Sequence, residues 1–192
     1  MDPPRPLFWY DLVDPLSWLL DRELQALEEE DGRLLVRRAP AEWNPPPAPL
    51  LDPRGEAWRT RREEAAGLAG PQGIELAEPR LVPWSRKAHE LVLLGREEGG
   101  EAELRQAIFR AFHAEGRDIG RVDVLVGIAV DAGLDRSHTK AVLDVDRHAA
   151  SVARSTAEAR EADALPLPAL RLESGVVRGF HDRHALRTLL IP

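Results

Sequence analysis

The sequence predicts an α/β fold in which two sheet-forming segments flank a helical insertion. Three observations lead to this prediction. The chain opens with an apolar run, a helical pattern and a second apolar run, continues with a long block of helical periodicity, and closes with two short strand patterns and a helix. The predicted organisation is therefore residues 1–53 for a βαβ half with a Pro-rich loop, 54–150 for a helical insertion, and 151–192 for an αββα half.

The first half begins with residues 7–13, an apolar, aromatic and β-branched run that predicts a buried strand. Asp14 can cap the helix that follows and Pro15 can be its first residue. This helix is expected to reach about Glu29, with Gly32 past its end.

A second strand is predicted over residues 33–38, which makes the segment a βαβ unit with parallel strands and a right-handed crossover. The six prolines from Pro40 to Pro53 then predict an ordered or semi-rigid loop.

The insertion shows apolar residues at helical spacing. Gly133 is expected to end one of its helices, and Asp135 or Ser137 to cap the next. An apolar stripe from Ala141 onward predicts one long helix that reaches about Ala162.

The final segment reads as a β-hairpin with strands at residues 169–172 and 176–178. A helix from His181 to Leu190 closes the chain, with Ala185, Leu186, Leu189 and Leu190 expected to face inward. This order of elements is that of a thioredoxin fold with a helical insertion.

Composition excludes several classes of function. The 192 residues contain no cysteine, which rules out disulfides, thiolate metal sites, a redox dithiol and a cysteine nucleophile. A net charge of −7 argues against general binding to nucleic acid or anionic membranes. No apolar run approaches the roughly 20 residues that span a bilayer, and the N-terminal residues lack the pattern of a signal peptide, so a cytoplasmic location is expected.

The turn from Asp14 to Ser17 is the candidate site, because a helix N-terminus offers free backbone N–H groups and the positive end of the helix dipole. Asp14 is either a general base or cation ligand or, as the favoured alternative, a helix cap. Ser17 lies one turn into the helix, where contact with a thiol or substrate is the less favoured alternative.

Four segments together resemble one known family: residues 8–19, 83–91, 108–119 and 167–172. They are similar to the DsbA-like thioredoxin-fold group that includes 2-hydroxychromene-2-carboxylate isomerases, kappa-class glutathione transferases and FrnE-type oxidoreductases. The resemblance implies a DsbA-like thioredoxin fold with an all-helical insertion. It also implies a small-molecule or thiol ligand such as glutathione, although no cofactor is certain, and a homodimer.

The resemblance also implies roles for four residues. Asp14 stands at the place of the family's first redox cysteine or thiol-activating serine, and Ser17 at that of the second cysteine, so both are candidate catalytic residues. Pro168 corresponds to the family's cis-proline, and Leu167 before it has the backbone that pairs with a thiol peptide. These two are the candidate cofactor-binding residues.

Asp14 departs from the family pattern, because an ionised carboxylate accepts hydrogen bonds and cannot donate one to a thiolate. We expect this carboxylate to be charged at neutral pH and to repel a thiolate by roughly 4 kcal/mol at ~4 Å and an effective dielectric of 20. Two hypotheses follow. The first is a cysteine-free protein without dithiol oxidoreductase activity that binds a ligand or partner. The second is a thiol-dependent isomerase or transferase, similar to 2-hydroxychromene-2-carboxylate isomerase, that uses Ser17, Leu167 and Pro168.

Aromatic, imidazole and guanidinium side chains supply secondary candidates. Core positions are favoured for Trp9, Tyr10 and Trp18, whereas one of Trp43, Trp58 and Trp84 is expected to line a pocket against the site. No metal site is expected, since His181 and His184 lack a third ligand. His89 and His113 are interpreted either as an acid or base or as solvated or capping residues, and His148 as a packed or edge residue. The basic cluster is either an anion site or a solvated helix face; it consists of Arg54, Arg59, Arg61 and Arg62.

Overall fold

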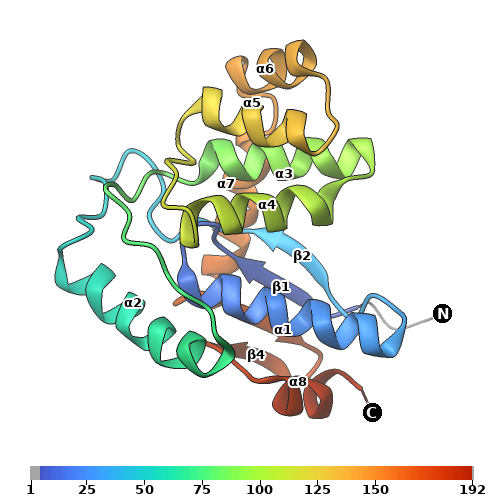
Figure 1. Ribbon diagram of the computed structural model, residues 1–192. Coiled ribbons are helices and arrows are strands. Elements are labelled where there is room, and N and C mark those ends of the chain that lie inside the picture. The colour runs from blue at the N-terminus through green and yellow to red at the C-terminus, as the bar shows by residue number, and fades with distance from the viewer. Residues whose placement is uncertain (1–4, 192) are drawn as a thin grey trace.

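The computed structural model describes residues 5–191, which form one mixed four-stranded sheet surrounded by helices (Figure 1). The strand order is β2-β1-β3-β4. Strands β1 (Leu7–Tyr10) and β2 (Arg37–Pro40) are parallel, whereas β3 (Ala169–Leu172) is antiparallel to β1 and to β4 (Gly175–Arg178). This is the topology of the thioredoxin fold that the sequence predicts.

The helices are α1 (Pro15–Asp31), α2 (Glu56–Ala69), α3 (Arg86–Glu98), α4 (Glu101–His113), α5 (Val122–Asp131), α6 (Arg136–Asp144), α7 (Ala149–Glu161) and α8 (Arg183–Leu190), and a short 3₁₀ turn spans Gly70–Gln72. Helix α1 contacts α2 and α8, while α3 contacts α4, α5, α6 and α7. No helix within residues 5–191 has both the length and the apolar character to cross a bilayer.

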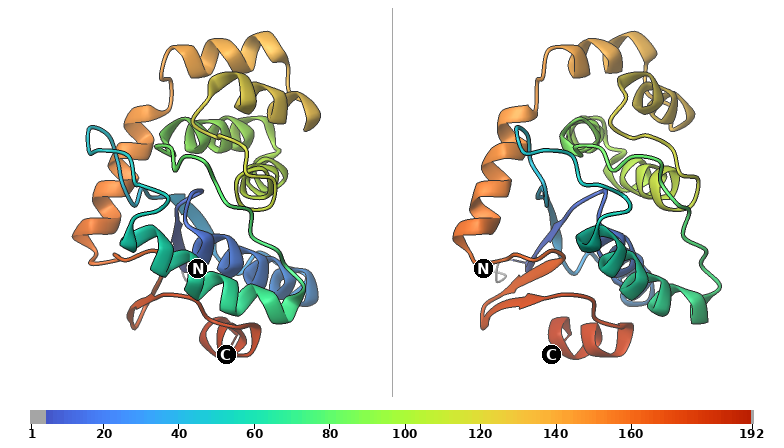
Figure 2. Two further views of the ribbon diagram at one scale, coloured as in Figure 1. Left: turned by 60° about the vertical axis from the view of Figure 1, so that its left-hand side comes forward. Right: turned by 90° about the vertical axis from the view of Figure 1, so that its left-hand side faces the viewer.

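Successive side chains of β1 point to opposite faces of the sheet and contribute to two separate hydrophobic clusters. Phe8 and Tyr10 belong to the main cluster, with the apolar face of α1 and residues of α3 and α4. Trp9 points to the opposite face and packs with Ala159 of α7 and with Leu167. Figure 2 accordingly shows α1 and α7 on opposite sides of the sheet.

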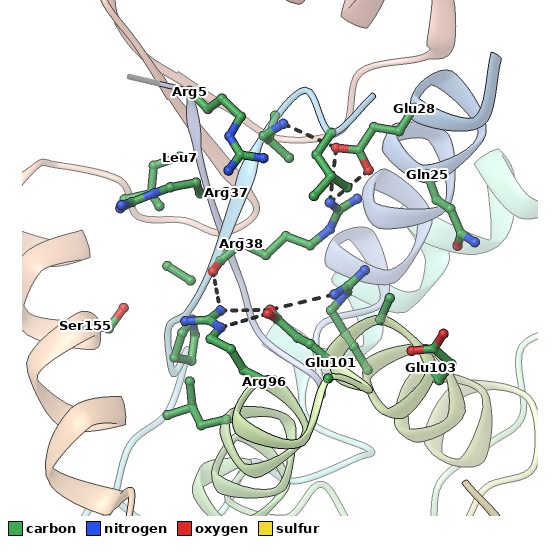
Figure 3. Close-up of a pocket in the computed structure, with 18 of the residues that line it drawn as sticks. Arg5, Leu7, Gln25, Glu28, Arg37, Arg38, Arg96, Glu101, Glu103 and Ser155 are labelled. Atoms are coloured by element: carbon green, nitrogen blue, oxygen red, sulfur yellow. Dashed lines mark hydrogen bonds and ion pairs between the residues drawn. The ribbon is translucent and has the colours of Figure 1, made fainter. Parts of the chain in front are cut away.

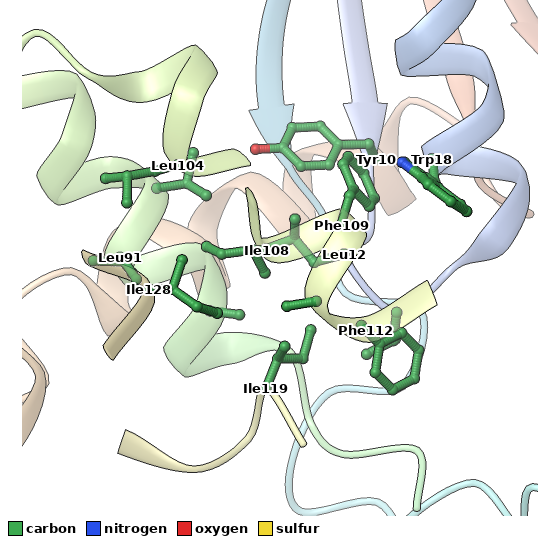
Figure 4. Close-up of a cluster of buried hydrophobic side chains, with 14 of the residues drawn as sticks. Tyr10, Leu12, Trp18, Leu91, Leu104, Ile108, Phe109, Phe112, Ile119 and Ile128 are labelled. Atoms are coloured by element: carbon green, nitrogen blue, oxygen red, sulfur yellow. The ribbon is translucent and has the colours of Figure 1, made fainter. Parts of the chain in front are cut away.

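The insertion shares its core with the sheet. Aromatic rings of α4 pack against β1 and α1, with Tyr10 and Phe109 centred 5.8 Å apart (Figure 4). Helices α3 and α4 approach closely at Gly95, where an added Cβ would overlap the side chain of Leu104. The helical insertion is therefore part of the same packed body as the sheet.

Several predicted boundaries are confirmed. Asp14 caps α1, Pro15 is its first residue, and Gly32 ends it in the left-handed conformation at φ 74°. Asp135 caps α6, and β3 and β4 pair as a hairpin.

The first two strands are shorter than predicted. β1 ends at Tyr10 because residues 11–13 turn into α1, with Asp14 N–H donating to the Asp11 carbonyl. β2 starts at Arg37 rather than residue 33, because the Glu28 carboxylate of α1 accepts the N–H groups of Leu35 and Val36. A side chain therefore takes the place of a strand partner there.

The single long helix predicted from Ala141 is wrong, because α6 and α7 are separate. Asp146 between them adopts a positive φ of 53°, Val145 is 71% exposed, and His148 N–H donates to the Glu90 carboxylate. The closing helix is also shorter than predicted: it starts at Arg183, and Leu189, expected to face inward, is exposed.

Candidate functional site

Asp14 lies at the start of α1 with its carboxylate almost fully used by the protein itself. Oδ2 accepts the Ser17 N–H at 2.9 Å and the Ser17 hydroxyl at 2.5 Å. Arg61 Nε donates to Oδ1 at 2.7 Å and Arg61 Nη2 to Oδ2 at 3.2 Å. The side chain is 1% exposed. Asp14 thus caps the helix, as predicted, and is also one half of a buried ion pair.

The Ser17 hydroxyl also forms its hydrogen bonds within the protein. Its hydroxyl proton goes to Asp14, and its oxygen accepts the Asp11 N–H at 3.2 Å. A serine has one hydroxyl proton to donate. In this conformation none is left for an incoming thiolate.

Arg61 reaches the site from α2, 47 residues along the chain. It shares a helix face with Trp58, three residues earlier, and its guanidinium lies 5.9 Å from the centre of the Trp43 ring. Trp43 in turn stacks on Trp58 at 6.1 Å. The sequence marks Arg61 only as one member of a basic cluster; no local pattern identifies its carboxylate partner.

Burial changes the protonation chemistry that the sequence predicts for Asp14. Desolvation raises the pKa of Asp14 above its ordinary value, while the charge and hydrogen bonds of Arg61 and the Ser17 hydroxyl act in the opposite direction. The helix N-terminus alone suggests only stabilisation of the anion. Arg61 therefore supplies the compensating positive charge within the protein.

The turn before Asp14 is held by one internal hydrogen bond and by contacts from two distant segments. The Asp11 carboxylate accepts the Trp43 N–H at 2.6 Å and the Val13 N–H at 3.2 Å. His113 Nε2 of α4 lies 3.0 Å from the Leu12 carbonyl oxygen. These contacts make the backbone around the site rigid.

His113 and His89 are buried, so the prediction of solvated or capping histidines is wrong. Burial lowers the pKa of His113 to about 3, and the ring is stacked on Trp18 at 5.3 Å. A neutral ring facing a carbonyl oxygen must carry its proton on Nε2, so His113 donates to Leu12. His89 Nε2 lies 3.4 Å from Asp11 Oδ1.

Leu167 and Pro168 directly precede β3, and the side chain of Leu167 lies on the face of the sheet opposite α1. Their peptide bond is cis, as predicted, and the Pro168 carbonyl accepts the Gly179 N–H. Leu167 packs with Trp9, and its own N–H and carbonyl make no hydrogen bond with residues 5–191. No hydrogen bond within this range joins the pair to Asp14 or Ser17, and their role in binding a thiol stays a prediction.

The aromatic candidates separate as follows. Trp9, Tyr10 and Trp18 are buried in the core. Trp58 lines a cavity of about 630 Å³ between α2 and residues 78–80, whereas Trp84 is 39% exposed and donates its indole N–H to the Ala48 carbonyl. Asp14 and Ser17 are absent from the wall of that cavity, so Trp58 lines a pocket beside the site rather than against it.

A second cavity, of about 1190 Å³, lies along β2 and is lined by charged residues of α1, α3, α4 and α7 (Figure 3). Many of its charges are paired internally: Arg38 binds Asp21 and Glu28, and Arg96 binds Glu101. None of the four candidate site residues lines it. Within residues 5–191, no group of three metal-ligating side chains is placed to hold a metal ion.

Comparisons with known proteins agree with this architecture. The family model of the DSBA-like thioredoxin domain matches residues 7–190. The uncharacterized protein YwbO of Bacillus subtilis is 29% identical over 157 residues, which cover 75% of this chain and 74% of YwbO.

Solved structures of other proteins share the fold, and two of them illustrate its range. A 2-hydroxychromene-2-carboxylate isomerase has a TM-score of 0.75 and 19% identity, covering 91% of this chain and 88% of its own. The cytosolic disulfide reductase DsbM of Pseudomonas aeruginosa, solved with GSH, has a TM-score of 0.65 and 20% identity, covering 98% of this chain and 93% of its own. The shared fold therefore occurs in both an isomerase and a disulfide reductase.

Proposed function

We propose that this chain, which belongs to the DSBA-like thioredoxin domain family, binds a ligand or partner and carries out no dithiol redox chemistry. The observation that carries the proposal is the Asp14–Arg61 ion pair at the start of α1. At the position of the family's reactive group it presents a carboxylate with four internal donors.

Electron balance supports the same proposal. Reduction of a disulfide by a dithiol requires two thiols that become a disulfide, and this chain contains no cysteine. The structural likeness to a disulfide reductase is thus a likeness of fold and does not extend to the redox chemistry. What the scaffold retains is a rigid turn, a cis-proline and cavities lined by charged side chains.

One observation favours a second candidate, a thiol-dependent isomerase or transferase. The backbone N–H and carbonyl of Leu167 beside cis-Pro168 lack partners within residues 5–191, which suits pairing with a thiol peptide such as glutathione. Against it stands Ser17, whose hydroxyl proton is already donated to Asp14. We therefore rank it second.

The two candidates separate in a calorimetric titration with reduced glutathione. Ser17→Ala is compared with Ser174→Ala, a matched change in the exposed hairpin turn, and circular dichroism checks that both fold. The first candidate expects any glutathione binding to be equal in the two variants. Loss of binding in Ser17→Ala alone would establish the second candidate in its place.

An insulin-reduction assay with dithiothreitol tests the absence of dithiol chemistry. We expect no rate above the protein-free background, because no thiol is available to form the mixed disulfide. A rate that scales with protein concentration would overturn the proposal.

We further propose a cytoplasmic protein that binds a small-molecule or thiol ligand, engages neither nucleic acid nor membranes, and assembles as a homodimer. The absence of cysteine suits a reducing compartment, and the net charge of −7 disfavours polyanionic partners. Light scattering coupled to size exclusion measures the assembly directly, and a monomer mass of 21.4 kDa across concentrations would exclude the dimer.

A further inference from the structure

The cavity beside Trp58 carries an excess of positive charge on an acidic protein. Its wall contains four arginines and two glutamates, whereas the whole chain has a net charge of −7. The lining residues are Pro53, Arg54, Trp58, Arg59, Arg62, Glu63, Glu78, Pro79 and Arg80. A concave, locally positive site of this kind concentrates anions.

Three of these arginines are uncommitted. Arg54, Arg59 and Arg80 form no ion pair with any residue from 5 to 191. Arg62 differs, because it is held by the Leu76 carbonyl at 2.8 Å and the Ala77 carbonyl at 3.4 Å. The cavity thus combines the hydrogen-bonded guanidinium of Arg62 with three guanidinium groups whose N–H donors are available to a ligand.

Trp58 contributes to the apolar part of the wall, together with Pro53 and Pro79. It is 3% exposed, and its ring stacks on Trp43 at 6.1 Å and meets Phe112 edge-on at 6.0 Å. Contact with these two rings fixes the orientation of the indole, and only a small part of it reaches the cavity. Apolar surface beside charged donors is typical of sites for small organic ligands.

We propose that this cavity binds a small organic anion, a carboxylate or phosphate attached to an apolar or aromatic group. The anionic group accepts from Arg54, Arg59 and Arg80, and the apolar group lies against Pro53, Pro79 and the small exposed part of Trp58. A guanidinium matches both carboxylate and phosphate in a bidentate geometry, so the anion class is shared between them. This inference rests on the proposed ligand-binding function and names the chemical class of the ligand.

The volume is consistent with such a ligand. About 630 Å³ falls within the range of roughly 300–1,000 Å³ that small-molecule pockets occupy. Arg61, one residue before Arg62, binds Asp14 instead of lining the cavity. Neighbouring residues of α2 therefore contribute to the cavity and to the Asp14 ion pair.

The test is an NMR titration of the full chain with phenyl phosphate, benzoate and the neutral analogue benzyl alcohol. The indole N–H signal of Trp58, assigned with Trp58→Phe, reports occupancy of the cavity. We expect saturable shifts with at least one of the two anions, weaker binding at higher ionic strength, and binding by benzyl alcohol weaker by about 10-fold or more. The stronger of the two anions identifies the preferred group.

The charge requirement is tested with Arg59→Gln/Arg80→Gln against Arg136→Gln/Arg160→Gln. The control pair is also exposed and unpaired within residues 5–191 but lies on α6 and α7, outside this cavity. We expect the cavity pair to weaken anion binding by about 10-fold or more and the control pair to leave it within about twofold.

Absence of a saturable Trp58 shift, equal affinity for benzyl alcohol, or equal weakening by both pairs would overturn the inference. These outcomes are independent of the insulin assay. Insulin reduction would overturn the proposed function and leave this titration unchanged, whereas an unoccupied cavity would overturn only the assignment of the ligand.

Discussion

Replacing Arg61 by methionine should destabilise the protein in a pH-dependent manner. The substitution keeps an apolar stem of similar length but removes both hydrogen bonds that Arg61 makes to Asp14. The carboxylate, 1% exposed, would then retain only its contacts with Ser17. A buried charge without a counter-charge is the expected source of the loss.

The magnitude follows from charge separation and burial. Two unit charges about 4 Å apart attract by roughly 4 kcal/mol at an effective dielectric of 20. Because the Arg61 side chain is 16% exposed, solvent screens part of this attraction. Breaking a buried pair typically costs about 3–5 kcal/mol, so we expect Arg61→Met to lower the free energy of unfolding by about 2–4 kcal/mol near neutral pH.

The pH dependence gives the prediction its sign. Burial already raises the pKa of Asp14, and loss of Arg61 raises it further. A carboxyl whose folded pKa is raised contributes stability below its unfolded pKa and loses that contribution as pH rises through the folded pKa. The penalty of Arg61→Met should therefore be smaller at about pH 5 than at about pH 7.5, by about 1 kcal/mol or more.

Urea unfolding followed by circular dichroism measures the effect at both pH values. Asp14→Asn/Arg61→Met is the decisive companion, since asparagine still caps a helix but carries no charge. We expect it to recover at least about half of the loss and to abolish its pH dependence. An equal penalty at both pH values, or no recovery in the double variant, would refute the ion-pair reasoning.

Three further predictions concern the surrounding scaffold. Because burial lowers the pKa of His113 to about 3, its contribution to stability is full above pH 6.5 and is lost as pH falls, by about 1.4 kcal/mol per unit; urea unfolding of His113→Phe should show a shallower acid slope than the wild type. Gly95→Ala should lower the free energy of unfolding by about 1–3 kcal/mol through overlap with Leu104, and a calorimetric melting temperature equal to that of the wild type would contradict it. Asp21→Asn, which leaves two buried arginines short of a counter-charge, should cost about 2–4 kcal/mol in the same urea assay, whereas the control Asp144→Asn in an exposed pair should cost less than about 1 kcal/mol.

The sequence predicts those parts of the fold whose causes are local. The apolar and aromatic run that includes residues 8–10 identifies a buried strand, and the Asp14–Pro15 pair with Gly32 gives both ends of α1. The missed features depend on contacts between distant segments. The N–H groups of residues 35 and 36 donate to the Glu28 carboxylate instead of pairing with another strand. The periodicity of the sequence does not indicate this contact.

The break between α6 and α7 shows the same limit. An apolar stripe from Ala141 to Thr156 is compatible with one continuous helix. The structure instead turns at Asp146, where Lys87 of α3 pairs with the Asp146 carboxylate at 2.6 Å and the Glu90 carboxylate of α3 accepts the His148 N–H. Partners on another helix therefore outweigh the local helical pattern.

The role of Asp14 depends both on its local sequence and on a contact with a distant segment. Its place before Pro15 predicts a helix cap, whereas the family resemblance stated from the sequence suggests a catalytic role. The partner that decides between these roles, Arg61, lies 47 residues away in a segment where the sequence shows only a basic cluster. Because the Asp14 carboxylate binds Arg61 through both oxygens and also accepts the Ser17 hydroxyl proton, a bound thiolate would have to displace an interaction already formed inside the protein. The need for that displacement opposes thiol activation at Asp14, and it is consistent with our proposal that the ligand binds in the cavity beside Trp58.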